Sequence, residues 1–76
     1  MSDALTNFSK RLKELRLEKD MGIRELASKL GMSHTAISQY ERCMRTPSID
    51  TCKLFADYFG TTCDYMIGLT DDRKRS

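Results

Sequence analysis

The sequence predicts a compact all-α domain of five helices. Apolar residues recur at intervals of three and four along most of the 76-residue chain, which is the spacing of one face of a helix. β-branched residues never alternate with polar ones over the length of a strand. Glycine occurs only 4 times and Pro47 is the only proline, so few positions interrupt a helix.

The first predicted helix covers residues 6–19, with a threonine as its candidate cap. Phe8, Leu12 and Leu15 fall at i, i+4 and i+7, so they form one apolar face, and basic residues occupy much of the remaining surface. Residues 20–22, which include a glycine, form the expected break after this helix.

The second and third predicted helices, residues 23–30 and 34–42, are joined by a tight turn. Gly31 accepts the left-handed backbone that ends a helix, and Ser33 offers a hydroxyl that caps the next one. The small side chain of Ala27 lies where the two helices are expected to cross. The inner faces of the pair consist of apolar residues: Ile23, Leu26, Ala27, Leu30, Ala36, Ile37 and Tyr40.

A loop over residues 43–47 is expected next, because Pro47 disfavours helix in the residue before it. Ser48 is the candidate cap of the fourth helix, which Gly60 ends. A fifth helix over residues 63–67 follows a threonine cap and is closed by Gly68. The predicted inner face of the fourth helix is apolar: Ile49, Cys52, Phe55, Ala56 and Phe59.

The chain length suits one domain. We expect an N-terminal extension over residues 1–5, the helical domain over 6–69 and a charged, frayed tail over 70–76. No apolar run approaches the roughly 18 residues of a membrane span, and the first residues lack the layout of a signal peptide. These features predict a cytoplasmic protein without membrane association.

The charge distribution is uneven. Residues 10–45 contain nine Lys or Arg and five Asp or Glu, whereas residues 46–72 contain one lysine and five aspartates. The positive segment also contains the predicted helix pair, so it is suited to a polyanionic partner. Solvated helix faces are the plainer interpretation of the same charges.

The outward side of the third helix carries short or planar hydrogen-bonding side chains: His34, Thr35, Ser38 and Gln39. Such groups are suited to base edges in the major groove of DNA, and Gln39 can form paired hydrogen bonds to adenine N6 and N7. No nucleophile–base pair, metal-ligand cluster or phosphate-binding glycine loop is present in the sequence. We therefore expect a binding protein rather than an enzyme, with no cofactor, metal or small-molecule ligand.

Five segments in order carry a resemblance to a known family: RLKELR at 11–16, ELASKLGMS at 25–33, AISQYE at 36–41, RTPS at 45–48 and LFADYFGTTCDYMIG at 54–68. Over residues 8–69 the chain resembles the lambda-repressor-like (Xre, Cro-type) helix-turn-helix DNA-binding domains. The resemblance implies a five-helix fold whose second and third helices form the helix-turn-helix. It also implies a transcriptional regulator, usually a dimer on a two-fold symmetric operator in double-stranded DNA.

The resemblance also assigns expected roles. His34, Thr35, Ser38 and Gln39 fall on base-reading positions, and Ser33, Arg42 and Arg45 on positions that hold the DNA phosphates. Arg16 and Glu41 match a structural ion pair between the first helix and the end of the third. The chain departs from the family pattern at Cys43, where glycine is common, and at residues 22–23, where a hydroxyl cap and a glutamine are usual.

Four residues near the C-terminus are predicted to form a dimer interface: Tyr65, Met66, Ile67 and Leu69. The prediction rests on the shortness of the fifth helix, which leaves little room to bury all four inward. A two-fold dimer would read half-sites about 10 bp apart. We therefore expect a sequence-specific repressor that binds an inverted-repeat operator as a homodimer.

Two alternatives remain. The same fold could serve as a protein-interaction module, either an antitoxin or an adaptor, which would bind DNA weakly and with little salt dependence. The second alternative is a redox or metal sensor based on the three cysteines, an odd number without a C-x-x-C pair. Within it, Cys43 lies beside Arg42 and near Arg45, and positive neighbours favour the reactive thiolate form of a thiol.

Overall fold

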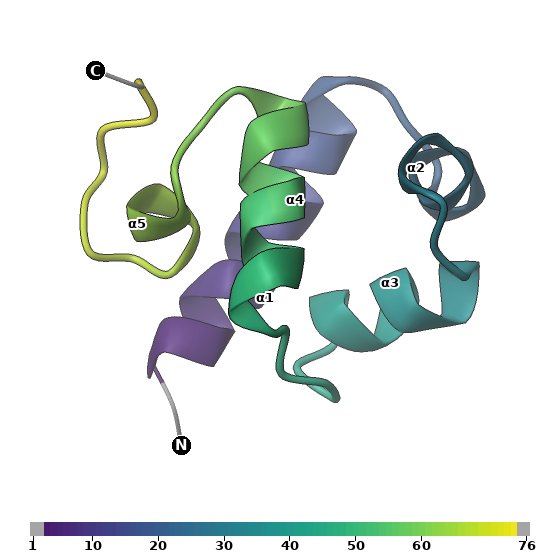
Figure 1. Ribbon diagram of the computed structural model, residues 1–76, viewed down its shortest axis with the longest axis horizontal. Helices are drawn as coiled ribbons and strands as arrows, with labels where there is room; N and C mark the ends of the chain where they lie inside the picture. Colours follow the sequence, from purple (N-terminus) through teal and green to yellow (C-terminus); the bar gives the residue numbers. More distant parts are fainter. Residues whose placement is uncertain (1–2, 75–76) are drawn as a thin grey trace.

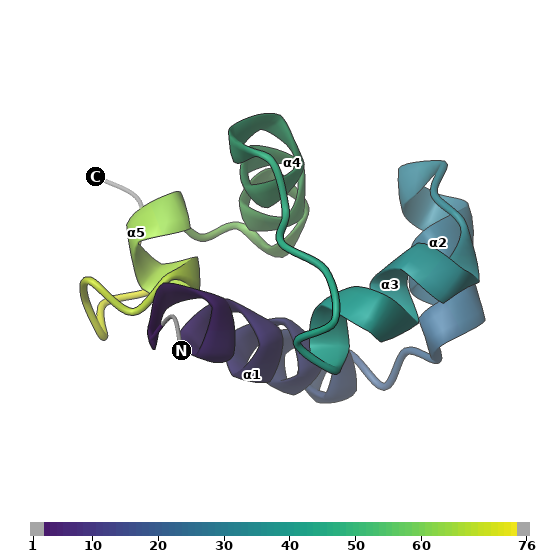
Figure 2. The same ribbon diagram turned by 90° about the horizontal axis from the view of Figure 1, so that it is seen from below.

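The computed structural model describes residues 3–74, and this part of the chain contains helices and no strand. Figures 1 and 2 show α2 and α3 together at one end of the molecule and α5 at the other, with α1 and α4 between them. The five helices are α1 (Asp3–Glu18), α2 (Ile23–Leu30), α3 (His34–Glu41), α4 (Ile49–Phe59) and α5 (Cys63–Met66). The predicted all-α fold is confirmed.

The first helix begins earlier than predicted. It starts at Asp3 rather than Thr6, so residues 3–5 of the expected extension are helical. An acidic residue in the first turn is favoured by the positive end of the helix dipole, and no glycine or proline interrupts the segment. The helix ends at Glu18, and Asp20 then adopts the left-handed conformation with φ 58°. Residues 1–2 of the expected extension lie outside the described residues.

Three of the four predicted N-terminal caps are confirmed, whereas the prediction for Thr6 is wrong because this residue lies inside α1. The hydroxyl oxygens of Ser33 and Ser48 accept hydrogen bonds from the backbone three residues later, at 3.1 and 3.0 Å, and Thr62 does the same at 3.1 Å. Gly31 and Gly60 end α2 and α4 in the left-handed conformation, with φ 67° and 70°. These local signals fix the ends of the helices that surround the candidate site.

Three aromatic rings form the centre of the core. Phe8 of α1, Tyr40 of α3 and Phe55 of α4 lie with their centroids 5.8–5.9 Å apart. Each pair meets edge to face, the arrangement that the charge distribution of aromatic rings favours. The cluster therefore joins three helices that are distant in the sequence.

The prediction for Ile49 is wrong. Its side chain is 85% exposed, whereas Cys52, Phe55 and Ala56 of the same helix are buried and Phe59 is partly buried. Ile49 is the first residue of α4, directly after the Ser48 cap. The helix has not yet reached the core at this point, so its first residue faces outward.

A buried ion pair connects α1 to the end of α3. Arg16 donates to both carboxylate oxygens of Glu41, at 2.7 and 2.9 Å, and also to the backbone oxygen of Met21 at 2.7 Å. The two charged side chains are only 8% and 5% exposed. The hydrogen bond to Glu41 raises the pKa of the Arg16 guanidinium above its usual value. The pair fixes the end of α3 relative to α1.

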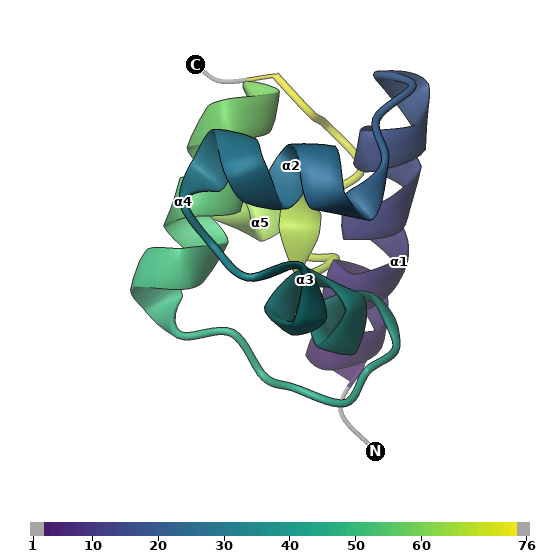
Figure 3. The ribbon, with the colours of Figure 1, turned by 90° about the vertical axis from the view of Figure 1, so that its right-hand side faces the viewer.

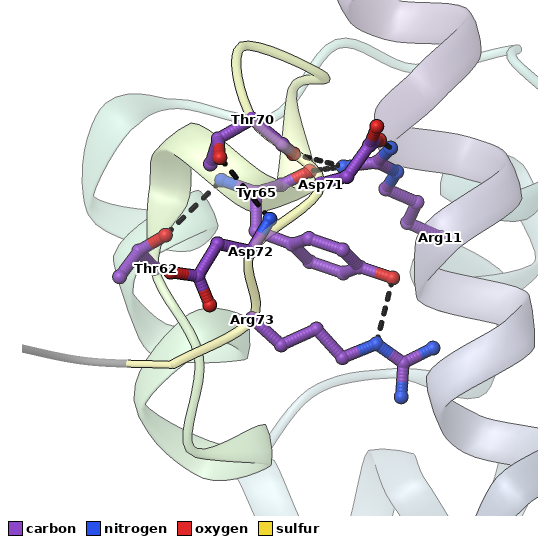
Figure 4. Close-up of polar contacts among 7 residues, drawn as sticks. All are labelled: Arg11, Thr62, Tyr65, Thr70, Asp71, Asp72 and Arg73. Atoms are coloured by element: carbon purple, nitrogen blue, oxygen red, sulfur yellow. Dashed lines mark hydrogen bonds and ion pairs between the residues drawn. The ribbon is translucent and has the colours of Figure 1, made fainter.

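The C-terminal segment was expected to be frayed, and over residues 70–74 this expectation is wrong. Arg11 of α1 donates to the backbone oxygens of Tyr65 and Thr70, and it pairs with Asp71 at 2.7 Å (Figure 4). Arg73 donates to the hydroxyl of Tyr65 at 2.8 Å. Residues 75–76 of the expected tail lie outside the described residues.

The guanidinium groups of Arg11 and Arg73 also contact the ring of Tyr65, at 4.2 and 5.3 Å from its centroid. Arg73 extends further to α1, where it pairs with both carboxylate oxygens of Glu18 at 2.6 and 2.7 Å. These contacts hold the segment after α5 against α1. Within residues 3–74, none of the helices has the length and apolar character needed to cross a membrane.

Replacing Glu41 by Ala is expected to lower the free energy of unfolding by about 3–5 kcal/mol, because Arg16 would remain as an unpaired charge in a buried position. Urea denaturation measures this change. The matched control is Asp57→Ala, which removes an exposed ion pair with Lys53 and should cost no more than about 0.5 kcal/mol. Equal losses in the two variants would contradict a structural role for the buried pair.

Replacing Arg73 by Gln is expected to raise the pKa of Glu18 toward its ordinary value. The hydrogen bond from Arg73 is the main cause that lowers this pKa. The contact between the C-terminal segment and α1 is therefore strongest above the ordinary glutamate pKa, and it weakens as the pH falls through the lowered pKa of Glu18. An NMR titration of the Glu18 side chain measures the shift. Lys74→Gln is the control and should leave the titration unchanged. Identical curves for wild type and Arg73→Gln would contradict the docked segment.

Candidate nucleic-acid interface

One side of α3 is buried and the other faces outward. Ala36, Ile37 and Tyr40 are 8%, 0% and 6% exposed, since they pack on α1, α2 and α4. Of the other five residues of α3, Glu41 pairs with Arg16, His34 and Thr35 are exposed, and Ser38 and Gln39 are half-buried. Figure 3 shows α3 at the front of the molecule, below α2. The predicted base-reading residues therefore share an accessible face.

The turn between α2 and α3 orients the accessible face formed by His34, Thr35, Ser38 and Gln39, which is the candidate recognition face. Gly31 ends α2, and its backbone N–H donates to the backbone oxygens of Ala27 and Ser28. The backbone N–H of Met32 also donates to the backbone oxygen of Ala27, at 2.9 Å. Ala27 itself is 4% exposed, and its small side chain permits close packing of the two helices. Leu26 is fully buried beside it. This local geometry is a helix-turn-helix.

Ser33 is exposed at the start of α3. Its oxygen accepts the capping hydrogen bond from the backbone N–H of Ala36. A hydroxyl group is also a donor, so the same side chain can donate to an anion while it caps the helix. A phosphate near this end would also face the positive end of the α3 dipole.

The loop after α3 turns back along the helix. Cys43 adopts the left-handed conformation with φ 59°, at the position where glycine is common in similar domains. The backbone N–H of Cys43 donates to the backbone oxygen of Tyr40 at 3.3 Å, and the backbone N–H of Met44 donates to the backbone oxygen of Gln39 at 2.8 Å. The left-handed conformation destabilises a residue other than glycine by about 1–2 kcal/mol, so Cys43 is strained. The same conformation returns the chain toward α3.

The reversal brings Arg45 beside the recognition face. Its guanidinium donates to the side-chain oxygen of Gln39 at 3.3 Å and lies 5.7 Å from the centroid of the Tyr40 ring. The contact uses the oxygen of Gln39, which can accept a second hydrogen bond, while the amide NH₂ group remains outside this contact. Arg42, which precedes Arg45 in the same loop, is the C-cap of α3 and is exposed to solvent. The sequence did not reveal the contact between Arg45 and Gln39, because it depends on the left-handed turn at Cys43.

The structure corrects the predicted dimer surface. Tyr65 and Met66 are 5% and 0% exposed, so they belong to the core of the chain itself. The single turn of α5 directs both inward, and the docked segment after α5 covers Tyr65 through Arg73. Of the four predicted residues, Ile67 is half-buried and Leu69 is 73% exposed.

The cysteines do not form a metal cluster. Within residues 3–74, no group of three or more His, Cys, Asp or Glu side chains could hold a metal ion. All three thiols are free: Cys43 is exposed, Cys52 is buried and Cys63 is half-buried.

The ion pair formed by Arg16 and Glu41 is buried between α1 and the end of α3, so its role is to position the helix.

Comparison with known proteins identifies relatives. The family model described as Helix-turn-helix matches residues 12–66. The HTH-type transcriptional regulator AnsR of Bacillus subtilis (strain 168) is 38% identical over 58 residues, which cover 76% of this chain and 50% of AnsR. The HTH-type transcriptional regulator ImmR of the same organism is 31% identical over 70 residues, which cover 92% of this chain and 55% of ImmR.

A phage protein is also similar. The Cryptic phage CTXphi transcriptional repressor RstR of Vibrio cholerae is 28% identical over 53 residues, which cover 70% of this chain and 48% of RstR. The chain thus spans about half the length of these curated relatives. No solved structure gives a significant match. The family match extends from the middle of α1 through α5 and includes the turn between α2 and α3, and the chain belongs to the lambda-repressor-like (Xre) helix-turn-helix family.

Proposed function

We propose that this chain is a sequence-specific DNA-binding transcriptional regulator that acts as a repressor. The observation that carries the proposal is the outward face of α3, which presents hydrogen-bonding side chains while its opposite side is buried. A helix of this width fits the major groove, where each base pair presents a distinct pattern of donors and acceptors. The names of the relatives AnsR, ImmR and RstR support a role in transcription.

The proposed contacts divide into two groups. His34, Thr35, Ser38 and Gln39 read bases, because they lie on the accessible side of α3. Ser33, Arg42 and Arg45 hold the phosphates on either side of the groove, since they lie before and after the helix. Phosphate contacts fix the register of the protein on the duplex, and base contacts supply the sequence preference.

Gln39 and Arg45 act together in this proposal. The hydrogen bond between them holds the arginine beside the recognition face before DNA arrives. The Tyr40 ring supports the same guanidinium from the core side. An arginine that is already positioned loses less side-chain entropy on binding, so more of its interaction with phosphate contributes to affinity.

We further propose that the regulator binds as a homodimer. One recognition helix reads only a few base pairs, and a two-fold dimer doubles the interface on half-sites about 10 bp apart. Exposed Leu69 and half-buried Ile67 are the apolar residues proposed for the dimer contact. Repression needs only occupancy of promoter DNA, whereas activation also needs a surface that contacts polymerase. The name of the relative RstR agrees with repression.

Selection of bound sequences from a random duplex pool tests the proposal directly. We expect enrichment of an inverted repeat with half-sites about 10 bp apart. The variant Gln39→Ala should lose the preference at one position in each half-site, by about 1–3 kcal/mol, because a paired contact to adenine is removed. A pool without enrichment would overturn specific DNA binding and favour the protein-interaction alternative. Enrichment without symmetry would overturn only the dimer.

Replacing both Arg42 and Arg45 by Ala is expected to weaken binding to every sequence and to make its salt dependence shallower. Each lost phosphate contact lowers the slope of log K against log salt by about 1 per DNA-binding domain. Fluorescence anisotropy at several salt concentrations measures this slope. The matched control is Lys53→Ala, an exposed basic residue on α4 that the proposal leaves away from DNA. An unchanged slope in the double variant would contradict the assigned phosphate contacts.

A further inference from the structure

An apolar groove lies away from the recognition face. Its volume is about 340 Å³, and it opens between the start of α1, the loop before α4, the start of α4, and α5. Leu5, Phe8, Pro47 and exposed Ile49 contribute to its walls. Two further lining residues are cysteines: Cys52 of α4 and Cys63 of α5. The groove therefore gives a small uncharged molecule access to two thiols at once.

The two thiols interact with each other. Burial raises the pKa of the Cys52 thiol to about 12, and the charge of Cys63 and a hydrogen bond to Cys63 add to this effect. Cys63 is half-buried, whereas Cys52 is 7% exposed. The third cysteine, Cys43, is exposed in the loop after α3 and does not line the groove. The structure thus separates a pair of neighbouring thiols from one isolated thiol.

We propose that Cys52 and Cys63 form a dithiol site that hydrogen peroxide oxidises to an intramolecular disulfide between α4 and α5. Both thiols are free in the structure and line one groove from two helices that pack together. Hydrogen peroxide is small and uncharged, so it can enter an apolar groove without the desolvation cost of an ion. None of the residues proposed to contact DNA lines the groove, whereas Ile67, proposed for the dimer contact, does.

The reaction proceeds in two steps. Cys63 attacks as the thiolate on one peroxide oxygen, the O–O bond breaks, and the leaving hydroxide takes up the thiol proton to form water. Cys63 is then a sulfenic acid. The sulfur of Cys52 attacks the sulfur of Cys63, and the hydroxyl group leaves with the Cys52 proton as a second water. In total, two thiols lose two electrons and two protons, and one peroxide is reduced to two waters.

The order of attack follows from the surroundings of the two thiols. Cys63 reacts first because it is the more accessible of the pair. Cys52 remains protonated at this stage, since its pKa is far above neutral pH. Oxidation of Cys63 removes the contribution of Cys63 to the raised pKa of Cys52, whereas burial, the largest contribution, remains. Cys52 therefore acts as the resolving thiol while it gives its proton to the leaving hydroxyl group.

Peptide mapping tests the proposal, because trypsin separates the three thiols. Cleavage after lysine and arginine gives peptides 43–45, 46–53 and 54–73, each with one cysteine. The full chain is treated with peroxide and then unfolded in guanidinium chloride, so that N-ethylmaleimide blocks buried as well as exposed free thiols. The digest is analysed by mass spectrometry without reductant. We expect peptides 46–53 and 54–73 as a disulfide-linked pair, which dithiothreitol separates.

Two variants make the test specific. Cys43→Ser should form the linked pair to the same extent as wild type, and it should remain a single chain on a non-reducing gel. Cys63→Ser should lose the linked pair, and Cys52 should then be blocked as a free thiol. The proposal is overturned if the wild-type chain retains the Cys52 thiol while Cys43 is oxidised. It is also overturned if the Cys43→Ser chain forms the linked pair only between two molecules.

Discussion

The position of Tyr40 is the constraint on which the rest of this structure depends. Its ring meets Phe8 and Phe55 edge to face in the centre of the core, and its backbone oxygen accepts a hydrogen bond from buried Ser9. The next residue, Glu41, pairs with Arg16. One turn of α3 is thus held by aromatic contacts, a backbone hydrogen bond and a buried ion pair. Because all of these contacts act on the end and the inner side of α3, the outward side of the helix remains accessible.

Local signals allowed much of this arrangement to be predicted. A serine or threonine before an apolar run and a glycine after it mark helix ends through short-range hydrogen bonds and backbone freedom, so α4 was predicted between Ser48 and Gly60, its observed caps. The spacing of Leu26, Ala27, Ala36 and Ile37 identified the packed sides of α2 and α3. The accessible polar side of α3 follows from the same pattern, since the residues between the apolar positions must face away.

The wrong predictions have a different origin. The frayed tail was predicted from its charge alone, but Arg11 and Glu18, more than 50 residues away in the sequence, pair with its residues. Tyr65 and Met66 were assigned to a surface because a short helix offers little area, yet the docked segment and α1 supply the missing cover. Ile49 followed the helical spacing but lies before the helix reaches the core. The docked segment and the burial of Tyr65 depend on contacts between distant parts of the chain, which spacing does not encode.

The hydrogen bond between Gln39 and Arg45 links two properties that could otherwise evolve separately. Under the proposed function, a change at position 39 would alter which base is preferred and would also free the arginine that lies beside it. The effects of substitutions at the two positions should therefore be non-additive, as is usual for residues in direct contact. A new operator preference acquired at residue 39 would then carry a change in overall affinity, and compensating substitutions in the following loop would be needed to restore it. In this way, one side-chain contact limits the evolutionary routes by which such a domain can change its target.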